Sequence, residues 1–522
     1  MEIEFASNCI ATNLLLILCM RLRALKTNVD NHAIQDIKAL FLDPQFWVLL
    51  IALTAVATSL TNHEIWLDET EAPGRIHTYG WNIKNLLESF KGDGHLPLYH
   101  ALLFPILNGG WAINVEAIPL VKVFTFIQYS VFACLICKWV RFPFSIFLLG
   151  SYYAFYEYGA ISRCYLLAMI FLLVIFRFIL TQKLNPIFQI IACFCLPLTH
   201  PLSMIIGFPL SIYLLIKRNW LAVTAFFASF VVCLYYLSIQ APEDPFSQFY
   251  YLESDDDKSF LTYLSLVYQF ILTSWFPLST KIQWWNQSFI NDISSPVLSI
   301  FVLSILTVMV ILAIVRVYIE NWLFGSALSV GVLTCIALLA DKYSYGYFRH
   351  VGYAAWPFIC FLGLALFGKN IDASAPSSQT FKTKLPKKLI QVASLSASCL
   401  IVFHFLSGGY AAYKDIRQPF ASLGQQISII DELQASREQE LLIFSQPCTT
   451  FLPAIVVSNW RYISRPLWHP EGTYCDALPE GTAPAELPQE FLLYTWRSTW
   501  DSSNPKARFT FQQPRSELGD IS

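Results

Sequence analysis

Three carboxylates lie within four residues, in the segment that follows the first long apolar stretch of the chain. They are Asp68, Glu69 and Glu71. A chain that leaves a bilayer here first meets water, so these side chains form either a solvated turn or a group held at the edge of a membrane cavity. Because a positioned carboxylate can act as a general base, Asp68 is the first candidate for that role, Glu69 the second, and Glu71 a supporting residue.

Further polar clusters occur at the ends of other apolar segments. Each member taken alone is compatible with a helix cap or with a long side chain that snorkels to the interface. A charged side chain at the centre of a bilayer costs about 2.5–3.5 kcal/mol, so several such groups at one membrane face indicate a site. The members of these clusters are His95, Tyr99, Lys122, Glu157, Tyr158, Arg163, Tyr165, His200, Arg349 and His350.

The composition is that of a membrane protein. Of the 522 residues, 55% are hydrophobic and only 13% are charged, whereas soluble proteins have about 25% charged residues. The aromatic fraction of 16% suits a protein with two wide membrane interfaces. The formal net charge of −2 does not indicate a nucleic-acid partner. We therefore expect an α-helical polytopic membrane protein.

The apolar segments predict a bundle of about 11 transmembrane helices, since a spanning helix needs about 20 apolar residues. Lys and Arg are enriched in cytoplasmic loops, and this rule places the basic loop 369–388 in the cytoplasm and the C-terminus outside. The predicted spans are 46–62, 116–138, 143–158, 165–182, 186–199, 201–216, 220–239, 296–315, 322–340, 351–368 and 389–407.

Two long loops, 63–115 and 240–295, are external in this topology. Each contains an apolar piece, at 96–107 and 260–278 respectively. Counting either piece as a span would invert the orientation of the loops that follow, so we expect both to lie in the outer leaflet or to dip into it. All the polar clusters named above then fall on the outer face.

Composition divides the chain into three parts. They are a cytoplasmic or interfacial N-terminal segment (1–45), a transmembrane domain (46–408) and a small external α/β domain (409–522). The last part has a helical pattern at 420–433 followed by short apolar strands. Its Cys448 and Cys475 lie in an oxidising compartment by this topology, so we expect them to form a disulfide.

The order of the polar motifs resembles that of a known family. An Asp-Glu pair follows the first span, a Gly-His-x-Pro segment opens the next helix, a Glu-Tyr segment precedes an Arg and a Tyr, and an Arg-His pair stands near the last spans. The residues that carry this order are Asp68–Glu69, Gly94–Pro97, Glu157–Tyr158 with Arg163 and Tyr165, and Arg349–His350. Over about residues 45–370 the chain resembles family-39-like membrane glycosyltransferases of the GT-C fold, and is similar to protein O-mannosyltransferases and lipid A aminoarabinose transferases.

This resemblance implies transfer of a sugar from a polyprenyl-phosphate donor to an acceptor hydroxyl or amine outside the membrane, with inversion at the anomeric carbon. Asp68 and Glu69 match the family's catalytic pair. Cationic groups suit the donor phosphate, and the candidates to bind it are His95, Lys122, Arg163, Arg349 and His350. The remaining candidates for substrate binding are Glu71, Tyr99, Glu157, Tyr158 and Tyr165.

The sequence also bears on a candidate metal site and on the cellular location of the protein. Asp68 and Glu157 offer oxygen ligands for a divalent cation, and the sequence does not choose between metal-dependent and metal-free relatives. Short basic loops and few glycosylation sequons fit a bacterial inner membrane, with the C-terminal domain in the periplasm.

Other function classes remain open. A transporter or flippase of a lipid-linked glycan would place ionisable groups near the midplane, often in paired repeats, and no repeat is evident in the sequence. An O-antigen ligase or polymerase would rely on Arg and His in a late loop, whereas here the Asp-Glu pair comes early. A third alternative is an inactive scaffold whose external domain binds a partner.

Overall fold

The protein is described by a computed structural model, and most of its described residues are helical. The described residues are 41–65, 67–88, 96–181, 185–238, 259–279, 288–293, 295–342, 348–369, 386–417 and 423–435, together with four strands, 443–446, 464–466, 492–495 and 509–511.

Six of the described helices are long and apolar enough to cross a membrane. They are α3 (Pro44–Asn62), α7 (Ala117–Trp139), α12 (Trp220–Ser238), α15 (Pro296–Glu320), α16 (Trp322–Lys342) and α20 (Lys387–Arg417). A seventh span results if α17 (Phe348–Val351) and η3 (Gly352–Ala354) are joined to α18 (Trp356–Phe367), from which they are bent by 48°. Four shorter apolar helices are α9 (Tyr165–Thr181), α10 (Pro186–Cys195), α11 (Pro201–Ile216) and α14 (Phe260–Trp275). This architecture indicates a helical membrane protein.

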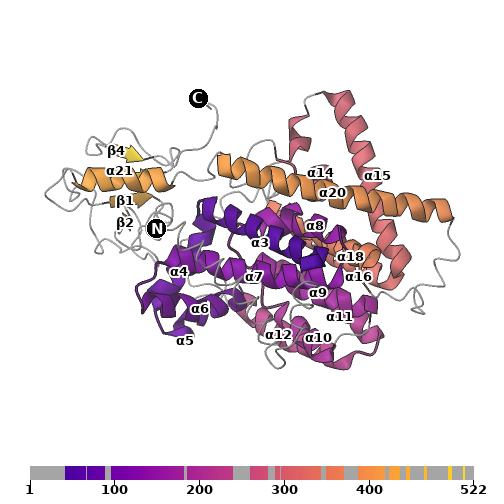
Figure 1. The fold of residues 1–522 in the computed structure, drawn as a ribbon, viewed down its shortest axis with the longest axis horizontal. Coiled ribbons are helices and arrows are strands. Elements are labelled where there is room, and N and C mark those ends of the chain that lie inside the picture. The colour runs from indigo at the N-terminus through magenta and orange to yellow at the C-terminus, as the bar shows by residue number, and fades with distance from the viewer. Residues whose placement is uncertain are drawn as a thin grey trace.

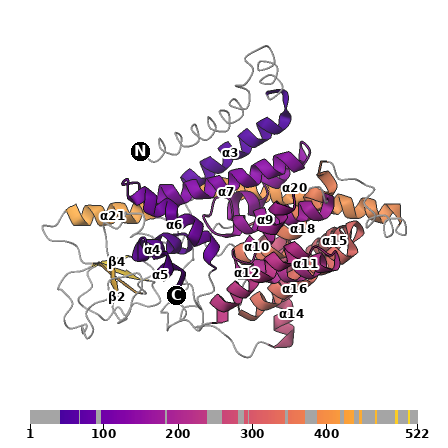
Figure 2. The same cartoon turned by 90° about the horizontal axis from the view of Figure 1, so that it is seen from below.

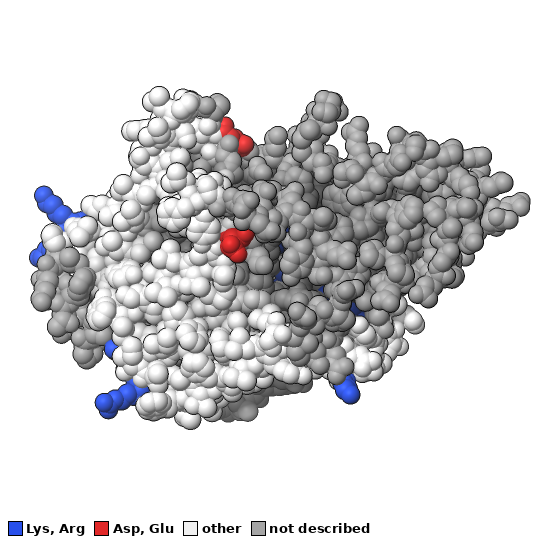
Figure 3. Space-filling view, turned by 180° about the vertical axis from the view of Figure 1, so that it is seen from behind, with Lys and Arg blue, Asp and Glu red and all other residues white. Residues whose placement is uncertain are grey.

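The outward sides of these helices are apolar, as a lipid-facing surface requires. On α15, for example, Val297, Ile300 and Phe301 are exposed. Figure 3 shows a face on which the described atoms are mostly uncharged, with the Lys and Arg side chains projecting at its edges. Figures 1 and 2 both show α3 and α7 running alongside each other, and these helices are in contact.

Local sequence explains where several helices begin. Pro at the first helical position already has the required φ and lacks the N–H that would go unpaired. Asp43 precedes Pro44, and its carboxylate accepts a hydrogen bond from Gln45 N at 2.9 Å. His200 precedes Pro201, and its Nδ1 accepts from Leu202 N at 3.2 Å. His200 is therefore the N-cap of α11.

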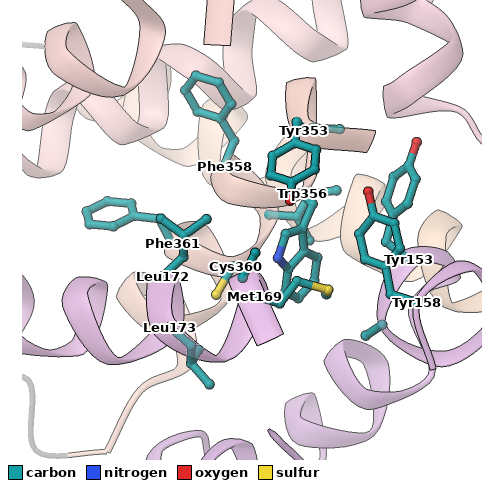
Figure 4. Close-up of a cluster of buried hydrophobic side chains, with 14 of the residues drawn as sticks. Tyr153, Tyr158, Met169, Leu172, Leu173, Tyr353, Trp356, Phe358, Cys360 and Phe361 are labelled. Carbon is teal, nitrogen blue, oxygen red and sulfur yellow. The ribbon is translucent and has the colours of Figure 1, made fainter. Parts of the chain in front are cut away.

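The predicted span 143–158 is interrupted in the structure. It forms a short helix α8 (Phe144–Leu149) and, after Gly150, a π-helical segment η1 (Tyr152–Glu157). A π-helical turn inserts an extra residue into the helix and is frequent at functional sites. Tyr152, Tyr153 and Tyr156 on η1 are fully buried, and Figure 4 shows Tyr153 and the following Tyr158 on one side of the buried cluster around Trp356.

Among its described residues, the loop 63–115 contains three helices, and the last of them covers the predicted apolar piece 96–107. These are α4 (Leu67–Tyr79), α5 (Ile83–Glu88) and α6 (Pro97–Trp111). Their apolar side chains share a core with the first turns of α7, formed by Ile76, Leu86, Leu103, Leu107 and Val121, among others. The start of α4 is thereby packed against the bundle.

In the C-terminal part, the described elements are α21 (Leu423–Ala435) and the strands β1 (Ile443–Gln446), β2 (Ser464–Pro466), β3 (Leu492–Thr495) and β4 (Phe509–Phe511). The strands form a parallel sheet in the order β2-β1-β3-β4. Figures 1 and 2 place α21 and the sheet at the end of the molecule where α4 and α5 lie. Cys448 and Cys475 are outside the described residues, so their disulfide stays a prediction.

Helix α20 crosses the break between α8 and η1 at very close range. The sequence predicts a span at 389–407, but the helix continues to Arg417. A Cβ on Gly408 would overlap the carbonyl oxygen of Gly150 and lie 3.0 Å from Tyr152 N. Only glycine allows this backbone approach, which positions the last turns of α20 beside η1.

We expect Gly408→Ala to lower the free energy of unfolding by about 1–3 kcal/mol, because the new methyl group meets backbone that cannot move aside easily. The measurement is thermal unfolding of the full-length protein in detergent. Gly409→Ala is the matched control, since nothing lies within 4 Å of its added Cβ. It should be neutral or gain up to about 1 kcal/mol from helix propensity, and an equal loss in both variants would contradict the close contact.

Candidate functional site

Glu69 is buried, with 1% of its surface exposed. Its Oε1 accepts a hydrogen bond of 2.7 Å from the backbone N–H of Ser162, in the loop between η1 and α9. The carbonyl of the same Ser162 accepts from the Tyr99 hydroxyl at 3.1 Å. Ser162 therefore joins α4, α6 and this loop, which are up to 93 residues apart in the sequence.

The other oxygen of Glu69 contacts a histidine. His63, the C-cap of α3, has its Nε2 2.9 Å from Glu69 Oε2 and its Nδ1 2.7 Å from Asp415 Oδ2. Asp415 belongs to the extension of α20 beyond its predicted end. The carboxylate–imidazole–carboxylate chain Glu69–His63–Asp415, here called the buried triad, is almost completely shielded from water.

The buried triad carries charge. Burial by itself lowers the pKa of His63, but the charges and hydrogen bonds of Glu69 and Asp415 outweigh it and raise the pKa to about 10. His63 is then an imidazolium at neutral pH and donates one N–H to each carboxylate. Two negative side chains and one positive side chain leave the triad with a net negative charge.

A second acid lies close to this triad. Glu157, at the end of η1, is 5% exposed and accepts a hydrogen bond of 2.9 Å from the Tyr152 hydroxyl. The Tyr156 hydroxyl, which is fully buried, senses the charges of Asp415, Glu157 and Glu69. It has no hydrogen-bond partner among the described side chains and backbone. The Tyr156 hydroxyl is therefore a buried donor that lies within reach of the charges of three acids.

Cationic and imidazole side chains lie next to the segment that carries Glu157 and Tyr158. Arg349 on α17 is 6% exposed, and its carbonyl accepts from the Tyr158 hydroxyl at 2.9 Å. The next residue, His350, has its ring 6.1 Å from that of His200 and 6.2 Å from that of Tyr165. The contact between η1 and α17 thus joins the Glu-Tyr motif to the Arg-His motif.

The rings around His200 form a continuous cluster. The His200 ring lies 5.0 Å from Tyr165 and is stacked on Tyr353 at 5.7 Å. Tyr165 is stacked in turn on Tyr158 at 5.1 Å. Tyr353 shares a hydrogen bond of 2.8 Å with Ser203. These rings connect α9, α11 and η3 behind the site.

Two further predicted cations are half-buried at the same end of the bundle. Arg163 follows Ser162 directly, and its charge acts on the Tyr99 hydroxyl. Burial raises the pKa of Tyr99, so this hydroxyl stays protonated and is a hydrogen-bond donor. Lys122 lies in the second turn of α7.

Some predicted residues fall outside what the structure describes. His95 is outside the described residues, and for Asp68 and Glu71 only the helical backbone is described. Among the described side chains, no group of three or more His, Cys, Asp or Glu is arranged to hold a metal ion. Because the side chain of Asp68 is outside the described residues, a cation held by Asp68 and Glu157 stays a prediction.

The opposite end of the bundle has polar contacts of a different kind. Gln45 donates to the carbonyl of Val140 at 2.9 Å, and Lys369 donates to the carbonyl of Cys137 at 2.9 Å. Arg316 pairs with Glu320 one turn along α15. These contacts cap and join helix ends, whereas the end that carries Glu69 gathers acids and cations from several segments.

His63 and Asp415 are not among the site residues that the sequence predicts. His63 precedes Glu69 by six residues, just after the first span, so its position offered a usable signal. Asp415 offered none, because it lies 352 residues from His63 and beyond the predicted end of its helix. The structure brings Glu69, Tyr99, Glu157, Tyr158, Tyr165, Arg349 and His350 together, while their chemical roles stay predictions.

The pKa of His63 has a consequence for stability. Because the folded-state pKa of about 10 exceeds the ordinary value of about 6.5, the protonated ring stabilises the fold fully below about pH 6.5 and loses this effect as the pH rises towards 10. We expect the Tm difference between the wild type and His63→Gln to be largest near pH 6 and to shrink by pH 10. Thermal unfolding in detergent measures it, and a difference that grows with pH would contradict the protonated assignment.

Comparisons of this chain with protein-family models, with curated proteins and with solved structures find no match.

Proposed function

We propose that this protein is a glycosyltransferase that moves a sugar from a polyprenyl-phosphate-linked donor to an acceptor hydroxyl or amine at one face of the membrane. The observation that carries the proposal is the burial of Glu69 at one end of an apolar helical bundle, joined through Ser162 to the segment that holds Glu157 and Arg163. Arg349 and His350 lie on the far side of the same segment.

The placement of these groups suits a lipid-linked substrate. The tail of such a donor stays in the bilayer and its phosphate and sugar reach the interface, so its site must lie at the end of a bundle. The apolar exterior accommodates the tail. Cationic side chains such as Arg163 and Arg349 would bind the phosphate, whose charge grows as the glycosidic bond breaks. Because the donor already carries a leaving group, no nucleotide-binding loop is required.

The acids would serve two roles. Glu69 already uses both of its oxygens, one for His63 and one for Ser162 N–H, so it suits an anchoring role. Asp68, the preceding residue, is then the candidate to remove the proton from the acceptor as general base. Glu157, held by Tyr152, is the second acid within this site and would orient the acceptor or the sugar.

The finer architecture belongs to the same proposal. It includes about 11 spans, a C-terminal α/β domain outside the membrane, and location in a bacterial inner membrane with that domain in the periplasm. The parallel sheet near the end of α20 that carries Asp415 supports a contribution of this domain to acceptor binding.

A transporter or flippase of a lipid-linked glycan is the second candidate. Discontinuous helices often form the substrate sites of transporters, and such breaks occur among the described helices between α8 and η1 and between α18 and the preceding turns. Transport would leave the sugar–phosphate bond intact, whereas transfer breaks it. The released polyprenyl phosphate therefore distinguishes the two candidates.

We expect a strain that lacks this protein to accumulate a polyprenyl-phosphate sugar and to lose one surface glycan decoration, both measured by mass spectrometry. Asp68→Asn should fail to restore the decoration, because a general base contributes about 10²–10⁴-fold to such a rate. Glu69→Gln should also fail, because it removes the anchoring carboxylate that contacts His63 and Ser162. Glu116→Gln should restore it, since this carboxylate is exposed and makes no capping hydrogen bond.

Two results would count against the proposal. Unchanged lipid-linked sugars in the deletion strain would remove the donor assignment, and full complementation by Asp68→Asn with Glu69→Gln together would remove the base. Membrane levels of each variant, measured by immunoblot, separate lost chemistry from lost protein.

A further inference from the structure

We propose that His63 is a positioning residue for the catalytic segment, and that Asp415 on α20 orients it. The inference rests on the proposed glycosyl transfer and extends it to two residues that the sequence motifs do not include. It stands on the geometry of the buried triad defined above.

The imidazole ring determines the directions of both contacts. Its two ring nitrogens point away from each other, and here each faces a carboxylate oxygen, at 2.7 Å for Asp415 and 2.9 Å for Glu69. In a neutral ring one nitrogen carries no proton, so its lone pair would face a carboxylate oxygen and the two would repel each other. Only the doubly protonated ring donates to both acids.

Glu69 is held at both oxygens as a result. His63 donates to Oε2 and Ser162 N–H donates to Oε1, so the carboxylate cannot rotate without breaking a bond. Glu69 lies in the first turn of α4, and its fixed side chain sets the direction in which this turn meets the bundle. The backbone of the preceding Asp68 belongs to the same turn, so a fixed Glu69 would hold the segment of the proposed base in one place.

Asp415 contacts the other side of the His63 ring, and its own position is set by the packing of α20. It is 2% exposed and lies two turns after Gly408, where α20 meets the backbone of the α8–η1 break. Its second oxygen, Oδ1, has no hydrogen-bond partner among the described atoms. The carboxylate is thus committed to His63, which is what an orienting group requires.

A purely structural ion pair is the alternative. Buried ion pairs often add little net stability, because desolvation offsets their attraction. A structural role would reduce the amount of folded protein, which lowers the maximal rate of a preparation but leaves kcat and KM per folded molecule unchanged. A positioning role predicts lower kcat at nearly constant KM, with recovery when the imidazole is returned.

The kinetic test uses full-length protein in nanodiscs and the lipid-linked sugar recovered from the deletion strain, with release of polyprenyl phosphate as the readout. We expect His63→Ala to lower kcat by about 10–100-fold, in line with a misplaced catalytic group, and to change KM less than threefold. Added imidazole should restore part of the rate. Added 1-methylimidazole should not, because it lacks the second N–H.

His404→Ala is the matched control. His404 is also a fully buried histidine of α20, but its ring packs on Tyr153 at 5.6 Å and forms no ion pair with a described carboxylate. Any loss of activity in this variant should not respond to imidazole. Asp415→Asn should lower kcat in the same direction as His63→Ala and should likewise not respond.

A second readout does not depend on activity. With ¹⁵N-labelled histidine rings, NMR of the wild type at about pH 8.5 should show one ring protonated at both nitrogens, since an ordinary histidine is neutral there. Glu69 on α4 and Asp415 on α20 are titratable groups whose charges act on His63. The signal should vanish in His63→Gln and should titrate at lower pH in Asp415→Asn.

The outcomes separate this inference from the proposed function. A wild type that releases no polyprenyl phosphate overturns the function, and the positioning role with it. Transfer that proceeds equally well in His63→Ala overturns the positioning role alone, as does a wild-type ring that is singly protonated at pH 8.5. Rescue by imidazole but not by 1-methylimidazole supports both.

Discussion

A single imidazolium between two carboxylates determines how the functional end of this protein is assembled. His63 ends α3, Glu69 begins α4, and Asp415 stands near the end of α20. Charges removed from water are expensive unless each is paired and hydrogen-bonded. The arrangement is therefore stable only when the three segments are in register, so these contacts favour one relative placement of the first and last long helices.

The surrounding structure satisfies the demands of this triad. Gly408 lets α20 approach the break after Gly150 closely enough to bring Asp415 to His63. The π-helical turn η1 directs Glu157 and Tyr156 towards the same region. The packed layer of α4, α5 and α6 excludes water from Glu69. The close contact at Gly408, the π-helical turn and the layer of short helices all lie at the same end of the bundle, and a bundle of regular spanning helices would contain none of them.

This clustering explains the difference between the two ends of the molecule. At one end the polar side chains cap and join helices, as Gln45 and Lys369 do. At the other end acids, an arginine and two histidines gather beside stacked tyrosines. Polar groups so concentrated within an apolar bundle are costly, and the lipid-linked anionic substrate proposed above would give a physical reason to retain them.

Hydrophobic length and proline-marked helix starts were readable in the sequence, because spanning a bilayer demands long apolar helices whatever their neighbours are. For the same reason Glu69, Glu157 and Arg349 stood out as polar groups at the ends of apolar segments. The tertiary structure alone decided which of these groups touch, that the segment 143–158 breaks at Gly150, and that α20 extends to Asp415. Such outcomes depend on close backbone contacts and on charge pairs between residues hundreds of positions apart, and no local pattern of apolar and polar residues encodes them.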